Sequence, residues 1–89
     1  MKIERIQYSS HFLRAFKAFK FSSLKETIHT RITLFQVDCF DPRLKTHKLK
    51  GSHHGEWSFS ITESHRILFV FHKENFVEFL DVDDHDIYR

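Results

Sequence analysis

The sequence predicts a single α+β domain in which an N-terminal strand and a helical hairpin pack on a mainly antiparallel meander sheet. Apolar residues recur at helical spacing in the first half of the chain and at strand spacing in the second half. Short turns join the predicted strands of the second half, and such connections place consecutive strands antiparallel. The chain has 89 residues and no linker or repeat, so residues 1–89 are expected to form one domain with a modest core.

The first half is predicted to contain one strand and two helices. Residues 2–8 form the strand, and Ser9 and Ser10 then provide an N-cap, because serine hydroxyls accept hydrogen bonds from the first amides of a helix. The apolar stripe of the first helix consists of Phe12, Leu13, Phe16 and Phe19. A capping box at residues 23–26 starts the second helix, which is expected to end near Val37. Its apolar stripe consists of Leu24, Ile28, Ile32 and Phe35. Because the break between the helices is short, they should form an antiparallel hairpin.

The second half is predicted to be strand throughout, beginning after Pro42. Residues 57–62 alternate between apolar and polar side chains, which is typical of a strand with one buried face. Residues 67–71 are all apolar, as in a central strand covered on both faces. Residues 76–82 form the last strand. Turns are expected at residues 63–65 and 73–75.

Composition and charge narrow the class of protein. The net charge is only +2, but residues 43–54 carry basic side chains and no acidic one, whereas residues 81–86 are rich in aspartate. This asymmetry indicates a basic face for phosphates, although a solvated lysine-rich loop would have the same composition. No apolar run is long enough to span a membrane and no signal sequence follows Met1, so a cytoplasmic location is expected. The single cysteine, Cys39, excludes an internal disulfide and is expected to be a packed or semi-exposed thiol.

Two histidines have opposite electrostatic surroundings. His47 lies among lysines, which favour the neutral imidazole, and His85 lies among aspartates, which favour the imidazolium. If the fold brings them together, they would supply a base and an acid to one substrate near neutral pH. Each histidine taken alone is also consistent with a hydrogen-bonded structural residue.

Other candidate residues are less specific. Arg66 begins the predicted central strand, where it would either clamp a phosphate or pair with Glu63 or Glu74. His53 and His54 are adjacent, so on a strand they would point to opposite sides, and no second metal-ligand motif accompanies them. The sequence therefore predicts neither a metal site nor a cofactor.

Four segments, taken in order, are similar to one known family. They are Asp41–Leu44 with Thr46–Gly51, then Trp57–Ile61, Arg66–Phe69 and His85–Arg89. In this order they resemble the RelE/ParE superfamily of bacterial toxin–antitoxin toxins, and among its members most closely the YafQ-like branch. The similarity covers essentially the whole chain and implies a RelE-like fold.

The resemblance implies a ribosome-dependent endonuclease that cuts mRNA in the A site without a metal. The implied catalytic residues are His47, His85, Arg66 and Tyr88. The implied RNA-binding residues are Arg43, Lys45, Lys48, Lys50 and His65, although His65 is also consistent with a turn residue. From their surroundings His47 is interpreted as the base and His85 as the acid, and the opposite assignment stays open. The implied partners are the ribosome, mRNA and a cognate antitoxin, with operator DNA bound only through the antitoxin.

The chain departs from the family pattern at one place. Relatives usually carry a glycine and a small hydroxyl residue just ahead of the last histidine, whereas this chain carries Asp83 and Asp84, which would repel an RNA phosphate. Two other classes therefore stay open. One is a gyrase-directed toxin of the same fold, against which the two histidines argue. The other is a non-catalytic homologue that only binds its antitoxin, with which the two aspartates are consistent.

Overall fold

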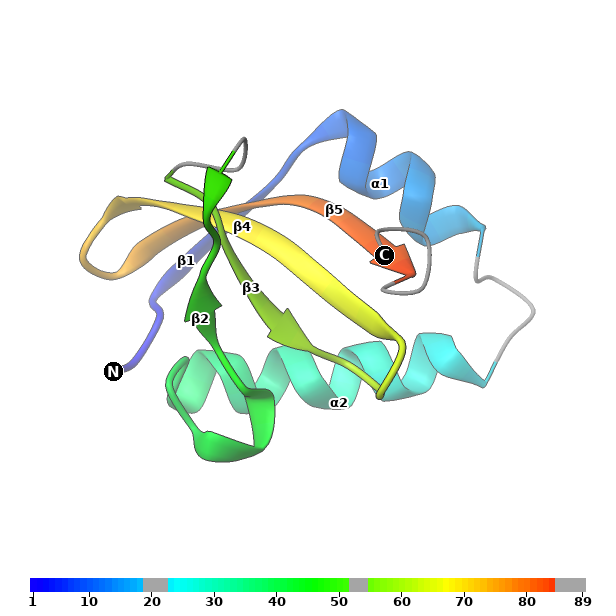
Figure 1. Cartoon of the computed structure of the whole chain (residues 1–89), viewed down its shortest axis with the longest axis horizontal. Helices are drawn as coiled ribbons and strands as arrows, with labels where there is room; N and C mark the ends of the chain where they lie inside the picture. The colour runs from blue at the N-terminus through cyan, green and yellow to red at the C-terminus, as the bar shows by residue number, and fades with distance from the viewer. Residues whose placement is uncertain (19–22, 52–54, 85–89) are drawn as a thin grey trace.

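The computed structural model of the chain describes residues 1–18, 23–51 and 55–84. Its elements are β1 (Arg5–Tyr8), α1 (Ser10–Lys17), α2 (Leu24–Val37), η1 (Pro42–Leu44, a 3-10 turn), β2 (His47–Lys48), β3 (Trp57–Ser60), β4 (His65–Lys73) and β5 (Phe76–Asp84). The strands form one sheet in the order β1-β5-β4-β3-β2 (Figure 1). Among the described strands β1 lies parallel to its neighbour, and the other pairs are antiparallel. The predicted α+β fold class is confirmed.

The first helix begins where the serines predict. Ser9 is the N-cap of α1, and its hydroxyl accepts a hydrogen bond from the amide of Phe12 at 2.9 Å. Phe12 is buried against the sheet, but Leu13 is 47% exposed, so the predicted apolar stripe is wrong at that position. Phe19 lies outside the described residues.

The second helix ends at Val37, as predicted, and buries Ile28 and Phe35 completely. The predicted capping box at its start is wrong. Ser23 has helical backbone angles, and its hydroxyl makes no capping hydrogen bond within the described part of the chain. Burial of the apolar face, which stabilises helices more than local propensity does, therefore accounts for this helix.

Both helices cover the same face of the sheet. The ring of Phe35 on α2 lies 4.4 Å from that of Phe59, 5.0 Å from that of Phe69 and 5.6 Å from that of Phe79, measured between centroids. Phe79 also contacts Phe12 of α1, at 5.5 Å. These rings are large and rigid, and they fill the core of a short chain with few residues. Figure 1 shows the two helices running in opposite directions, as a hairpin requires.

The connection between the helices and the sheet differs from the prediction. Residues after Pro42 were expected to be strand, but Asp41 caps a 3-10 turn by accepting a hydrogen bond from the amide of Arg43 at 2.9 Å. Cys39 packs beside this turn and is fully buried, and burial raises the pKa of its thiol, so the expected packed thiol is confirmed. Within the described ranges, no helix is both long enough and apolar enough to cross a bilayer.

Candidate active site

Polar side chains gather on the sheet face opposite the helices, in two rows of cross-strand partners. In one row His47 on β2 pairs with Ser58 on β3. In the next row Ser60 pairs with Arg66 on β4, which pairs in turn with Asp83 on β5. Partners across antiparallel strands point to the same face, and successive rows lie about 7 Å apart along the strands. The imidazole and the guanidinium therefore reach toward the same space from either side.

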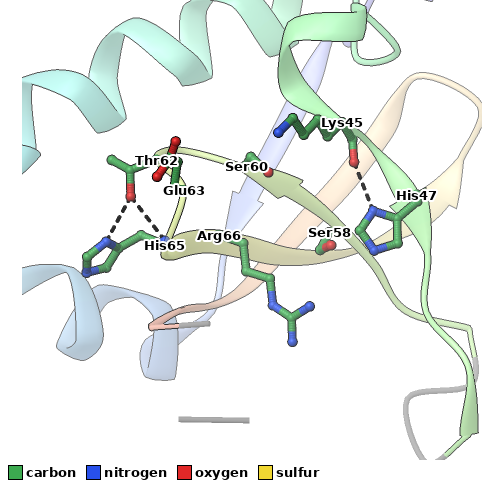
Figure 2. A pocket seen from close by; sticks show the side chains of 8 residues that line it. All are labelled: Lys45, His47, Ser58, Ser60, Thr62, Glu63, His65 and Arg66. Atoms are coloured by element: carbon green, nitrogen blue, oxygen red, sulfur yellow. Dashed lines mark hydrogen bonds between the residues drawn. The ribbon is translucent and has the colours of Figure 1, made fainter. Parts of the chain in front are cut away.

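A cavity of about 200 Å³ opens at these rows, as Figure 2 shows. Its lining residues are Lys45, His47, Ser58, Ser60, Thr62, Glu63, His65 and Arg66. The cavity thus collects four of the predicted site residues, which come from the segment before β2 and from strands β2 and β4. It places a titratable imidazole beside two permanent cations, which is a suitable environment for an anionic substrate.

The imidazole of His47 is oriented by the backbone. Its Nδ1 lies 2.8 Å from the carbonyl oxygen of Lys45, as drawn in Figure 2. Because a carbonyl oxygen can only accept a hydrogen bond, Nδ1 carries the proton. The neutral ring then has its lone pair on Nε2, which is the arrangement that a general base requires.

His65 occupies a different part of the cavity wall. Its Nδ1 lies 3.0 Å from Oγ1 of Thr62, and the same oxygen accepts hydrogen bonds from the amides of Ser64 and His65. Since two amides already donate to this oxygen, the Thr62 hydroxyl proton is directed at Nδ1. Figure 2 shows the ring turned toward Thr62, away from His47. His65 therefore secures the start of β4, where it is the first strand residue instead of part of the expected turn.

Arg66 is held by an ion pair. Its Nε donates to Oδ1 of Asp83 at 3.2 Å, and the two side chains are only 15% and 5% exposed. The resemblance implies that both residues lie near the substrate, but the sequence does not predict that they lie beside each other.

A second cavity, of about 400 Å³, adjoins the first and is lined in part by Arg31, Arg43 and Lys45. Arg31 of α2 donates from Nη1 to the carbonyl oxygen of Arg43 at 3.1 Å. Lys45 lines both cavities and has a φ of 51°, the one positive φ of a non-glycine residue among those described. A polyanion passing from the first cavity to the second would therefore stay beside cations.

Asp41 holds this basic turn in place, and its effect should depend on pH. The side chain and amide of Arg43 donate to the carboxylate and lower the pKa of Asp41 to about 2. A pKa that is lower in the folded state adds stability above the ordinary pKa of the group, and that stability disappears as the pH falls through the folded-state value. We expect Asp41→Asn to unfold at a lower urea concentration than the wild type near neutral pH. The difference should vanish as the pH falls below about 2. A difference that is the same at both pH values would contradict this role.

Other predicted residues lie elsewhere. Lys48 and Lys50 are exposed and line neither cavity, and Lys48 pairs across the strands with Trp57. His85 and Tyr88 lie outside the described residues, as do His53 and His54.

The structure adds residues that the sequence analysis missed. They are Arg31, Ser58, Ser60, Thr62 and, as the partner of Arg66, Asp83. The two serines and the threonine are the polar half of the alternation that predicts β3, so the pattern contained them without indicating that their face forms a cavity. Ser58 is 1% exposed, and its hydroxyl has no hydrogen-bond partner among the described residues. No pattern in the sequence distinguishes Arg31 from the other basic residues of its helix.

Comparison with known proteins identifies the fold. No protein-family model matches this sequence, and no curated protein is significantly similar to it. Solved structures do match. YafQ from E. coli superposes with a TM-score of 0.78, covering 96% of this chain and 98% of its own at 17% identity. A YoeB/ParE toxin from Agrobacterium tumefaciens gives a TM-score of 0.75, covering 92% and 99% at 20% identity. The chain has the RelE-like toxin fold.

A further match is the YoeB–YefM toxin–antitoxin complex from Staphylococcus aureus, with a TM-score of 0.71, covering 96% of this chain and 99% of the other at 18% identity. At such identities the RelE-like fold is what the proteins share. The chemistry of the cavity has to be argued from the residues of this chain.

Proposed function

We propose that this chain is the toxin of a bacterial toxin–antitoxin pair, and that it acts in the cytoplasm as a ribosome-dependent endoribonuclease that cuts mRNA in the A site. The observation that carries the proposal is the cavity shared by His47, Arg66 and Lys45, which combines a proton acceptor with two cations. The likeness to YafQ and YoeB toxins supports the toxin class.

The proposed reaction is a transfer within the RNA strand. The ribose 2′-hydroxyl gives its proton to Nε2 of His47, and its oxygen attacks the adjacent phosphorus. The bond from phosphorus to the 5′-oxygen of the next nucleotide breaks, and that oxygen takes a proton from the acid. The products are a 2′,3′-cyclic phosphate and a free 5′-hydroxyl. DNA has no 2′-hydroxyl and would not be cut.

The cations have separate tasks in this proposal. Arg66 lines the cavity in which the phosphate would sit, and its guanidinium would stabilise the charge that grows on the phosphorane. Lys45, Arg43 and Arg31 continue the basic surface and would hold the strand beyond the reacting bond. Lys48 and Lys50 would contact phosphates farther away.

Two proposed roles rest on the sequence and on the family resemblance. His85 is the proposed acid, and Tyr88 would stack on a base of the codon. Both lie outside the described residues. His65 would contact RNA at the cavity wall, in addition to its bond with Thr62.

The proposed partner is a cognate antitoxin. The matched YoeB structure is a toxin–antitoxin complex, and the two adjoining basic cavities of this chain would favour an acidic segment. An antitoxin that covers these cavities would block RNA directly, and operator DNA would be reached only through it.

Primer extension on a translated message, after induced expression of the chain, tests the function. We expect new 5′ ends within codons and no cuts in a matched message that lacks its start codon. Growth arrest with intact mRNA and broken chromosomal DNA would instead identify a gyrase-directed toxin. Intact mRNA without arrest, together with tight binding to the antitoxin, would identify a non-catalytic homologue.

The separate tasks of the cations predict different kinetic effects. Arg66→Ala should slow single-turnover cleavage at saturating protein on the order of 10²-fold, because it removes a charge that acts in the transition state. Lys48→Ala combined with Lys50→Ala should instead weaken ribosome association and reduce its salt dependence. Equal effects of both changes on rate and association would contradict this division.

A further inference from the structure

The ion pair between Arg66 and Asp83 joins a lining residue of the proposed phosphate site to a neighbour on the next strand. The two residues are direct cross-strand partners on β4 and β5, and Nε of the arginine donates to Oδ1 of the aspartate at 3.2 Å. Arg66 is at the same time a lining residue of the 200 Å³ cavity. The carboxylate of Asp83 is therefore bound to the same guanidinium that a substrate phosphate would need.

Burial makes this contact strong. The side chain of Asp83 is 5% exposed and that of Arg66 is 15% exposed, so water screens their attraction poorly. A carboxylate so buried is costly unless it stays paired, and this cost holds the guanidinium in place. A phosphate that enters the cavity therefore meets an arginine whose charge is already balanced by the carboxylate of Asp83.

We propose that Asp83 is a built-in counter-ion that competes with substrate phosphate for Arg66 and so sets the anion affinity of the site. In the free protein the aspartate accepts a hydrogen bond from Nε of the guanidinium, and a phosphate reaches that side of Arg66 only when it displaces or shares this contact. Asp83 thereby limits binding of RNA backbone to the resting protein. The inference rests on the proposed function only in taking the cavity as a phosphate site.

The chain offers a matched control on the same strand. Asp81 also contacts a side chain of another element, since its Oδ1 lies 3.2 Å from Nε2 of His11 on α1, and it is not among the lining residues of the cavity. Asp81→Asn removes the same charge from β5 as Asp83→Asn does, so any general effect of net charge on phosphate binding appears in both variants.

The test is a titration of the purified chain with inorganic phosphate, in which NMR monitors the Nε–H signal of Arg66 and the ring signals of His47. Asp83→Asn keeps the shape of the side chain and an oxygen acceptor for Nε but removes the charge. We expect it to bind phosphate about tenfold or more tightly than the wild type, as removal of a like charge at short range implies. Asp81→Asn should bind like the wild type, and Asp83→Glu should keep the weak affinity. Equal phosphate affinity in the wild type and Asp83→Asn would overturn the inference.

The wild type supplies a second measurement that needs no variant. If Asp83 occupies Arg66, phosphate should shift the His47 signals at lower concentration than the Arg66 Nε–H signal. Signals that shift together would contradict the proposal. Should Asp83→Asn fail to fold, as judged by circular dichroism, Asp83→Ser takes its place with the same expected tightening.

Cleavage assays separate this inference from the proposed function. Tighter phosphate binding by Asp83→Asn without mRNA cleavage by either form would support the counter-ion and reject the nuclease. Cleavage by the wild type with unchanged phosphate binding in Asp83→Asn would support the nuclease and reject the counter-ion.

Discussion

Replacing His47 with alanine is expected to lower the single-turnover rate of mRNA cleavage on ribosomes by ~10²–10⁴-fold, which is the usual contribution of a positioned general base. The reason is geometric. The carbonyl of Lys45 holds the proton on Nδ1, so the lone pair of the neutral ring is on Nε2, the atom that is proposed to accept the proton of the 2′-hydroxyl. Cleavage by the purified variant at saturating concentration measures the effect.

His72 provides the control for this change. It is an exposed histidine farther along β4, it bonds to Glu78 at 2.7 Å, and it does not line the cavity. His72→Ala should cleave at the wild-type rate. Because His47 is itself exposed, His47→Ala should also unfold at the same urea concentration as the wild type. A variant without His47 that cleaves normally would remove the imidazole from the mechanism.

Replacing Phe35 with alanine is expected to lower the free energy of unfolding by about 3–5 kcal/mol. Phe35 is fully buried and its ring contacts rings on β3, β4 and β5, so its loss leaves a cavity between α2 and three strands. Domains of this size are stable by only ~5–15 kcal/mol, so this single change would consume much of the total. Urea denaturation followed by circular dichroism measures it.

Phe40→Ala is the matched control, since the same atoms are removed from a ring that is 43% exposed and lies 5.9 Å from Trp57. Phe40→Ala should lower the free energy of unfolding clearly less than Phe35→Ala does. Similar losses in the two variants would mean that the contacts of α2 with the sheet are not the main source of stability.

The sequence alone predicts most elements because their signals are local. Ser9 caps α1, Ile28 and Phe35 of the apolar stripe of α2 are buried, and the alternation around Phe59 marks a strand. The errors are also local in origin. Ser23 and Glu26 have the spacing of a capping box, but the backbone of Ser23 is already helical and its hydroxyl does not cap the helix within the described ranges. Pro42 starts a 3-10 turn before the strands begin.

The site is only partly predictable, because cross-strand register is not local. The pair Phe69–Phe79 on the helix-covered face would by itself place Val82 opposite Arg66. A register shift between Leu68 and Phe69 adds one residue to β5 and brings Asp83 there instead. A shift of one residue exchanges the faces of a strand, so this irregularity decides which charge Arg66 meets.

The sequence by itself determined the α+β class, the helical hairpin and the order of the strands along the chain. Periodicity is sufficient for these, since each depends on neighbours along the chain. The proposal of His47, Lys45 and Arg66 as site residues needed the family resemblance as well. Only the tertiary structure decided that Lys45 has a positive φ and lines two cavities, that Arg31 joins the basic surface, and that Asp83 is paired with Arg66. These contacts depend on how distant segments pair and bend in the folded chain, and no local pattern encodes that.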